Sequence, residues 1–158
     1  MLSEDELREI EEQIATSYDA RAACVPAMRV VQAHRGWVSD EALQDLARLL
    51  NMTPEELDGV ATFFNLIFRH PVGRHVLKVC DGAVCWALGS QSLMEHLEQK
   101  LGVKSGGTTA DGRFTLLPIC CVGDCDHGPA MMVDDKLVRN VTPEMVDELI
   151  ESGGEVGE

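Results

Sequence analysis

Four cysteines in two close pairs, Cys80-x4-Cys85 and Cys121-x3-Cys125, constrain this chain more than any other feature. Each pair follows a run of β-forming residues, and a segment with helical periodicity joins the two runs. A strand–helix–strand unit in one sheet is parallel, so both strands end at the same edge of the sheet. The pattern therefore predicts four thiolates at that edge, where open parallel sheets bind their ligands.

Four thiolates in one place usually hold a metal centre, and we favour an iron–sulfur cluster. A structural zinc site with four cysteines is the main alternative, because the spacings do not exclude it. The absence of Cys-x-x-Cys disfavours a thioredoxin-type dithiol, and a Rieske centre would need two histidines in place of one pair. The count alone fits a 2Fe–2S or a 4Fe–4S cluster. Gly82 and Gly123 lie inside the two loops and allow backbone N–H groups to turn toward cluster sulfurs.

A doublet of cysteines complicates the choice of ligands. Cys120 precedes Cys121, and a Cys120-x4-Cys125 spacing would equal that of the first pair. Adjacent residues of a strand point to opposite faces, so we expect only one of the two to bind the metal. Cys24 falls in a predicted helix and is expected to be a small buried hydrophobe.

The first half of the chain is predicted to be helical. Capping boxes start helices at Ser3-x-x-Glu6 and at Thr53-Pro54-Glu55-Glu56, and further helices are expected from Ala22 to Arg35 and after Ser39. The helix that starts at Thr53 carries a stripe of Phe63, Phe64 and Phe68. Core packing is the expected role of this stripe, and a partner-binding face is the alternative.

The periodicity of the second half changes from strand to helix and back. Strands are predicted at 76–80, 114–120, 130–133 and 137–141, with helices at 90–101 and after Thr142. The predicted fold class is α+β: an N-terminal helical bundle followed by a thioredoxin-like α/β domain of order β-α-β-β-β-α. The expected domains are residues 1–72 and 73–152, and residues 153–158 are expected to form a frayed tail.

Charge and hydropathy exclude several classes of function. The net charge of −14 would repel phosphate backbones, so we expect no nucleic acid partner; a protein partner with a basic face and a role in solubility alone remain as alternatives. No apolar run approaches the roughly 20 residues that span a bilayer, so direct membrane insertion is not expected. The acidic, polar start resembles neither a secretory signal nor a transit peptide. We therefore expect a cytoplasmic protein whose six cysteines serve metal or redox chemistry.

At the cysteine loops the chain resembles a known family. The matching segments are 79–85, 111–118, 120–125 and 128–132, together with the helical stretch 59–64. They are similar to the thioredoxin-like 2Fe–2S subunit of the NADH-oxidising module of bacterial respiratory complex I, the 24-kDa-subunit family. The resemblance extends from about Ala22 to Glu151, and relatives of this family serve NAD-linked formate dehydrogenases and hydrogenases.

The resemblance implies a set of ligands and a cofactor. Carried over position by position, the family's ligands to one 2Fe–2S cluster fall on Cys80, Cys85, Cys121 and Cys125. This choice resolves the doublet in favour of Cys121. The chain departs from the family at Cys120, where an acidic residue is common, and at Asp124, where a small apolar residue is common.

The resemblance also implies a role within a larger enzyme. The chain would be an electron-transfer subunit of an NADH:quinone oxidoreductase that exchanges one electron with FMN, with no catalytic residues of its own. FMN and NADH would be bound by a partner subunit, since no Gly-x-Gly-x-x-Gly follows a strand here. Further peripheral-arm subunits would hold it on the cytoplasmic face of the inner membrane. The alternatives are the equivalent diaphorase subunit of a formate dehydrogenase or hydrogenase, a free thioredoxin-like ferredoxin, and a zinc-stabilised adaptor.

Three carboxylates flank the predicted cluster loops. Asp81, Asp124 and Asp126 are expected to lower the reduction potential by favouring the oxidised, less negative state, or else simply to face water. His127 is expected to be a solvated loop histidine, and coupling of cluster reduction to protonation is the alternative. Trp86 is expected either to shield the cluster or to pack locally.

Overall fold

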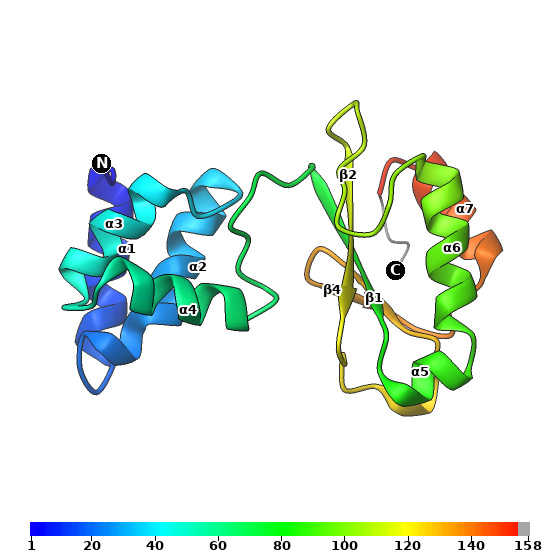
Figure 1. The fold of residues 1–158 in the computed structure, drawn as a ribbon, viewed down its shortest axis with the longest axis horizontal. Coiled ribbons are helices and arrows are strands. Elements are labelled where there is room, and N and C mark those ends of the chain that lie inside the picture. Colours follow the sequence, from blue (N-terminus) through cyan, green and yellow to red (C-terminus); the bar gives the residue numbers. More distant parts are fainter. Residues whose placement is uncertain (155–158) are drawn as a thin grey trace. The chain divides into compact units, whose positions relative to one another are not determined.

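The chain forms two compact units, Met1–Pro71 and Val72–Glu158, in a computed structural model that describes residues 1–154 (Figure 1). Of the predicted frayed tail, residues 155–158 lie outside the described residues. Gly154 lies within them and is ordered against the preceding helix, since its N–H donates to the Leu149 carbonyl at 2.9 Å. Within residues 1–154, every helix is too short or too polar to cross a membrane.

The first unit is all helical, as predicted. Both predicted capping boxes are present, at Ser3 with Glu6 and at Thr53 with Glu56, and Gly36 ends the second long helix in a left-handed conformation at φ 81°. The elements are α1 (Glu4–Thr16), a 3₁₀ turn (Arg21–Ala23), α2 (Cys24–Arg35), α3 (Asp40–Leu49) and α4 (Pro54–Phe63). Cys24 is half-buried against the core of this unit, close to the burial expected of it.

A buried ion pair joins the first two long helices. Glu6 on α1 is 2% exposed, and both of its carboxylate oxygens accept hydrogen bonds from Arg35 at the end of α2, at 2.5 and 2.6 Å. The Arg35 guanidinium lowers the pKa of Glu6 from 4.5 to about 2. The apolar core of the unit includes Ile10 of α1 and Met28 of α2, both fully buried.

The prediction that the phenylalanine stripe packs in the core is wrong for two of its three residues. Helix α4 ends at Phe63, because Phe64 leaves the helical region with ψ 102°, and the chain turns so that Ile67 takes the buried position. Phe63 is 81% exposed and Phe64 is 43% exposed. Their rings pack edge to face with centroids 5.2 Å apart.

The second unit contains a four-stranded sheet of order β2-β1-β3-β4. Strands β1 and β2 are parallel, and the pairs β1–β3 and β3–β4 are antiparallel. The bounds are β1 (His75–Cys80), α5 (Ala83–Ala87), α6 (Ser90–Leu101), β2 (Phe114–Ile119), β3 (Met131–Val133), β4 (Lys136–Val138) and α7 (Pro143–Glu151). The predicted α+β fold class and order are confirmed, with one addition: the short helix α5 forms where only a loop was expected.

Helices α6 and α7 lie side by side against one face of this sheet (Figure 1). Leu77 and Val79 of β1 are buried among side chains of both helices, such as Leu97 and Val146. Outside this core, Asp147 of α7 is bonded to His96 and Lys100 of α6. The sheet is thereby fixed from one side, and the ends of β1 and β2 are held in place.

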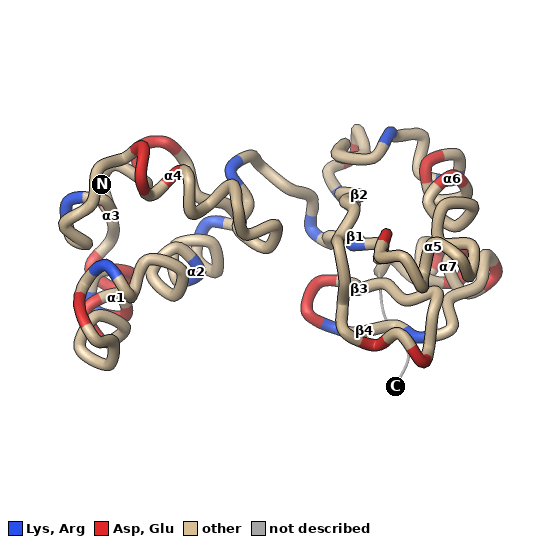
Figure 2. Tube along the Cα trace, turned by 60° about the horizontal axis from the view of Figure 1, so that its bottom comes forward, with Lys and Arg blue, Asp and Glu red and all other residues tan. Residues whose placement is uncertain are grey.

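Acidic residues are spread over both units rather than gathered in one patch (Figure 2). They occur on helices of the first unit and on the loops and helices of the second, with Lys and Arg interspersed. This distribution agrees with the expectation of a surface that repels nucleic acid.

Replacing Glu6 by Gln is expected to destabilise the protein in a pH-dependent way. Because the pKa of Glu6 is lowered in the folded state, its contribution is present above pH 4.5 and is lost as the pH falls toward 2. The contribution is on the order of 3 kcal/mol. Denaturant unfolding followed by far-UV circular dichroism should show a lower stability of Glu6→Gln at pH 7 and a flatter acid limb. The matched control is Glu11→Gln, an exposed residue of the same helix; an equal loss in both variants would contradict the account.

A fragment of residues 1–72 is expected to fold on its own. The core of the first unit, from Ile10 to Ile67, is drawn entirely from this part of the chain. Thermal unfolding of the fragment should be cooperative, as expected of a small two-state domain. A broad, non-cooperative change in circular dichroism would show that residues 1–72 are not an independent domain.

Candidate metal centre

The parallel pairing of β1 with β2 brings the two cysteine pairs to one edge of the sheet. Cys80, the last residue of β1, pairs with Ile119, the last residue of β2, and Cys121 follows two positions later. Figure 1 shows α5 and the segment after β2 at the same end of the sheet. The prediction that both strands end at the same edge is confirmed.

The first loop folds into α5 and buries its two thiols. Gly82 precedes the helix, and Cys85 lies within it. Cys80 and Cys85 are each 2% exposed. A Cβ on Gly82 would lie 2.8 Å from the Cys120 carbonyl oxygen, so only glycine lets the two loops approach this closely.

The second loop leaves its two thiols exposed. Gly123 adopts φ 81°, and its N–H donates to the Cys121 sulfur at 3.3 Å. Cys125 begins a short 3₁₀ turn (Cys125–His127). Cys121 and Cys125 are both exposed, in contrast to the thiols of the first loop. The Gly123 N–H thus donates to the sulfur of one predicted ligand, and donation to the sulfurs of a cluster stays a prediction.

Two residues that the sequence analysis did not assign to the site hold the loops together. A Cβ on Gly128 would lie 3.3 Å from the Cys85 sulfur and 2.8 Å from Leu88 Cδ1. The Ala130 N–H donates to the Cys85 sulfur, and the Ala130 carbonyl accepts from the Cys80 N–H at 3.1 Å. The segment Gly128-Pro129-Ala130 can be read from the sequence. Its contact with Cys85 depends on the fold of the two loops, which no local sequence pattern reveals.

The thiols interact both within and between the two pairs. The pKa of Cys85 is raised by burial and, to a lesser degree, by the Cys80 and Cys125 thiols. The pKa of Cys125 is raised first by the charge of Cys121, then by burial and by Cys80. Gathering four thiolates is therefore unfavourable without a cation, and a bound metal removes this repulsion.

Four cysteine thiols at one edge of the sheet match the donor set of a 2Fe–2S cluster. In a 2Fe–2S cluster each iron takes two protein sulfurs, so pairs of thiols suffice. A structural zinc ion needs four ligands around one centre. The two loops each supply two of the four thiols, and this donor set fits a 2Fe–2S cluster.

Cys120 is not part of either pair. It lies just after β2, its side chain is exposed, and its carbonyl oxygen is the atom that faces Gly82. Because β2 ends at Ile119, the alternation of a strand does not decide between Cys120 and Cys121. The hydrogen bond from Gly123 to the Cys121 sulfur favours Cys121.

The three carboxylates near the loops differ in their surroundings. Asp81 and Asp126 are exposed, and neither forms an ion pair within residues 1–154. Asp124 is 16% exposed and is bonded to Arg139 and to His127. The Arg139 guanidinium, followed by His127, lowers the pKa of Asp124. Asp124 is therefore a paired carboxylate that does not simply face water, which was one of the two roles expected of it.

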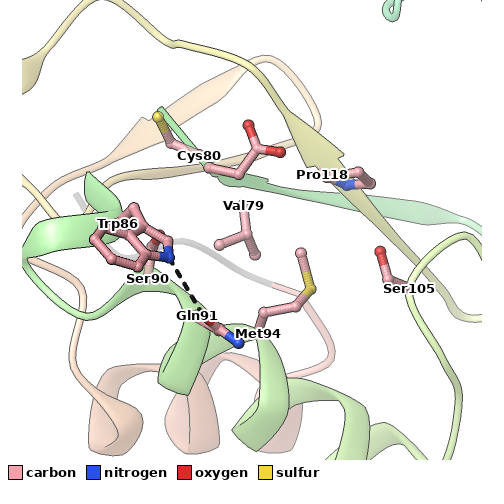
Figure 3. Close-up of a pocket in the computed structure, with 9 residues that line it drawn as sticks. Val79, Cys80, Trp86, Ser90, Gln91, Met94, Ser105 and Pro118 are labelled. Carbon is pink, nitrogen blue, oxygen red and sulfur yellow. Dashed lines mark hydrogen bonds between the residues drawn. The ribbon is translucent and has the colours of Figure 1, made fainter. Parts of the chain in front are cut away.

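A cavity of about 280 Å³ lies beside Cys80 on the α6 side of the loops (Figure 3). Figure 3 shows the Cys80 sulfur directed away from Met94, so the thiol does not point into this space. Trp86 donates from Nε1 to Gln91 Oε1 at 3.2 Å and is 64% exposed. Its ring lines the cavity, and its exposure shows that it is not packed in the core. The lining residues are Val79, Cys80, Asp81, Trp86, Ser90, Gln91, Met94, Ser105 and Pro118.

Comparison with known proteins gives a consistent result. The family model for thioredoxin-like [2Fe-2S] ferredoxins matches residues 10–153. One subunit of the NADH-quinone oxidoreductase of Pseudomonas aeruginosa is 45% identical over 152 residues, which cover 96% of this chain and 92% of that protein. The corresponding subunit of the Escherichia coli K12 enzyme is 48% identical over 150 residues, covering 95% and 90%.

A solved structure shows a related fold in another enzyme. The crystal structure of an NAD⁺-reducing [NiFe]-hydrogenase in the H₂-reduced state superimposes with a TM-score of 0.68 at 25% identity. The match covers 80% of this chain and 22% of that chain. The fold therefore also occurs as one part of a larger NAD-linked enzyme.

Replacing Gly82 by Ala is expected to disturb the contact between the loops. The added Cβ would meet the rigid backbone oxygen of Cys120 at 2.8 Å, so one loop must shift. We expect a loss of about 1–3 kcal/mol in unfolding free energy, together with lower iron content after reconstitution. The control is Gly59→Ala in α4, where nothing lies within 4 Å and alanine should stabilise the helix. Unchanged iron content and stability in Gly82→Ala would contradict this role.

Proposed function

The chain belongs to the thioredoxin-like [2Fe-2S] ferredoxin family, and on this premise we propose that it is the electron-transfer subunit of an NADH:quinone oxidoreductase. The observation that carries the proposal is that the parallel pairing of β1 with β2 brings both cysteine pairs to one edge of the sheet. Relatives that are named as one subunit of NADH-quinone oxidoreductase, and that match almost end to end, support it. The chain is accordingly a non-autonomous part of an oxidoreductase.

The proposed ligands are those that the two loops present. Cys80 and Cys85 would hold one iron of a 2Fe–2S cluster, and Cys121 and Cys125 would hold the other. When bound, such a cluster supplies a carrier that accepts and returns one electron. Cys120 lies outside the set.

The protein prepares this site with backbone donors and with burial. The N–H groups of Gly123 and Ala130 donate to Cys121 and Cys85, so each pair has one sulfur whose negative charge is stabilised. The first pair is buried and excludes water, while the second pair is exposed. An electron donor would therefore approach most closely from the side of Cys121 and Cys125.

The proposed partner is a subunit that binds FMN and NADH. This chain has no glycine-rich nucleotide motif, and a redox centre with one exposed side needs a donor docked against it. Any association with the membrane would then pass through partner subunits at its cytoplasmic face. Purification of the tagged chain from native membranes tests this. Co-purifying FMN and NADH:ferricyanide reductase activity are expected, whereas a flavin-free monomer would indicate a free ferredoxin.

The likeness to an NAD⁺-reducing hydrogenase favours one alternative, a diaphorase subunit of a hydrogenase or formate dehydrogenase. The same purification separates the two functions. Quinone reduction by NADH supports the respiratory enzyme. Nickel with H₂ oxidation, or molybdenum with formate oxidation, would assign the chain to the alternative.

Serine variants of single cysteines should distinguish the proposed ligand Cys121 from its neighbour Cys120. We expect Cys121→Ser to lose most of its iron and acid-labile sulfide, because a serine hydroxyl is a poor substitute for a thiolate. The matched control is the adjacent Cys120→Ser, which should keep full iron content and visible absorbance. Loss of the cluster in Cys120→Ser but not in Cys121→Ser would reverse the ligand assignment.

A further inference from the structure

We propose that Arg139 is a positioning residue that ties the second ligand loop to the end of the β-hairpin and neutralises the Asp124 carboxylate beside Cys125. The inference rests on the proposed function, since it assumes a cluster held by Cys125.

Arg139 reaches the ligand loop from a different part of the fold. It follows β4, and its Nε donates to Asp124 Oδ2 across 15 positions of the sequence. The other carboxylate oxygen, Oδ1, lies 2.8 Å from His127 Nδ1. Asp124 is only 16% exposed, so this carboxylate is held from both sides immediately before Cys125.

The backbone after Arg139 completes the tether. The Asn140 N–H donates to the His127 carbonyl at 2.8 Å, and the Val141 N–H donates to the Pro129 carbonyl at 2.8 Å. The loop is thus fastened at three points, one before Cys125 and two after it. The side-chain ion pair is the one of these three points that lies on the N-terminal side of Cys125.

The charge of Arg139 also changes the electrostatic effect of Asp124 on the reduction of the cluster. A carboxylate beside a thiolate-bound cluster disfavours the addition of an electron, and a nearby cation cancels this effect. Asp81 and Asp126 have no such cation within residues 1–154. Asp124 therefore acts mainly in holding the loop, because its charge and that of Arg139 cancel at the cluster while both are present.

A double-mutant cycle tests the charge. In EPR-monitored redox titrations, each cluster takes up one electron from dithionite through mediators. Arg139→Gln should shift the midpoint potential downward and Asp124→Asn upward, changing the reduced-to-oxidised ratio at a fixed potential by about fivefold each. The Asp124→Asn/Arg139→Gln double variant should return close to the wild type. The control is Lys136→Gln, which removes one positive charge from an exposed residue of β4 and should leave the potential unchanged.

Iron release to a chelator tests the tether independently. Arg139→Gln and the double variant should both release iron about tenfold faster than the wild type, because both lack the ion pair. The double variant thus restores the potential but not the retention of iron. Shifts of the same sign in both single variants, no shift in either, or wild-type iron release in Arg139→Gln would overturn the proposal. A wild-type protein without any iron–sulfur cluster would instead overturn the proposed function.

Discussion

The candidate site depends on one constraint, the parallel pairing of β1 with β2. This pairing puts Cys80 opposite Ile119, and the chain must continue from both strands at the same edge. The helix that connects the strands returns over the sheet face and packs there, so a buried apolar core that includes Leu77, Leu97 and Leu116 holds the strands in register. The positions of the cysteines are therefore a consequence of hydrophobic packing between the sheet and its helices.

Bringing the loops into contact has an electrostatic cost. Close thiolates raise one another's pKa, and burial adds to this in the first loop. The fold offsets part of the cost with backbone donors, and it uses Gly82 and Gly128 where a Cβ would force the loops apart. A bound metal cluster would offset the rest of this electrostatic cost, because bonds to iron replace the repulsion between the sulfurs.

Local signals in the sequence were sufficient for most of the fold. Caps such as Thr53 and the cysteine spacing act over a few residues, and the structure has the predicted elements within a residue or two at most ends. What the sequence did not reveal depends on long-range contacts. Exposure of Phe63 follows from where the chain turns after α4, and the ion pair of Asp124 with Arg139 joins residues 15 apart with no periodic pattern. The short helix α5 contains only five residues, too few for a helical period to be seen.

We propose that the two cysteine pairs hold one 2Fe–2S cluster between them. The most direct measurement is metal and acid-labile sulfide analysis of anaerobically purified protein, with EPR spin quantitation after reduction. The account predicts two irons and two sulfides per chain and a spin-half signal that integrates to one spin. One zinc ion per chain, without sulfide and without a signal, would contradict it.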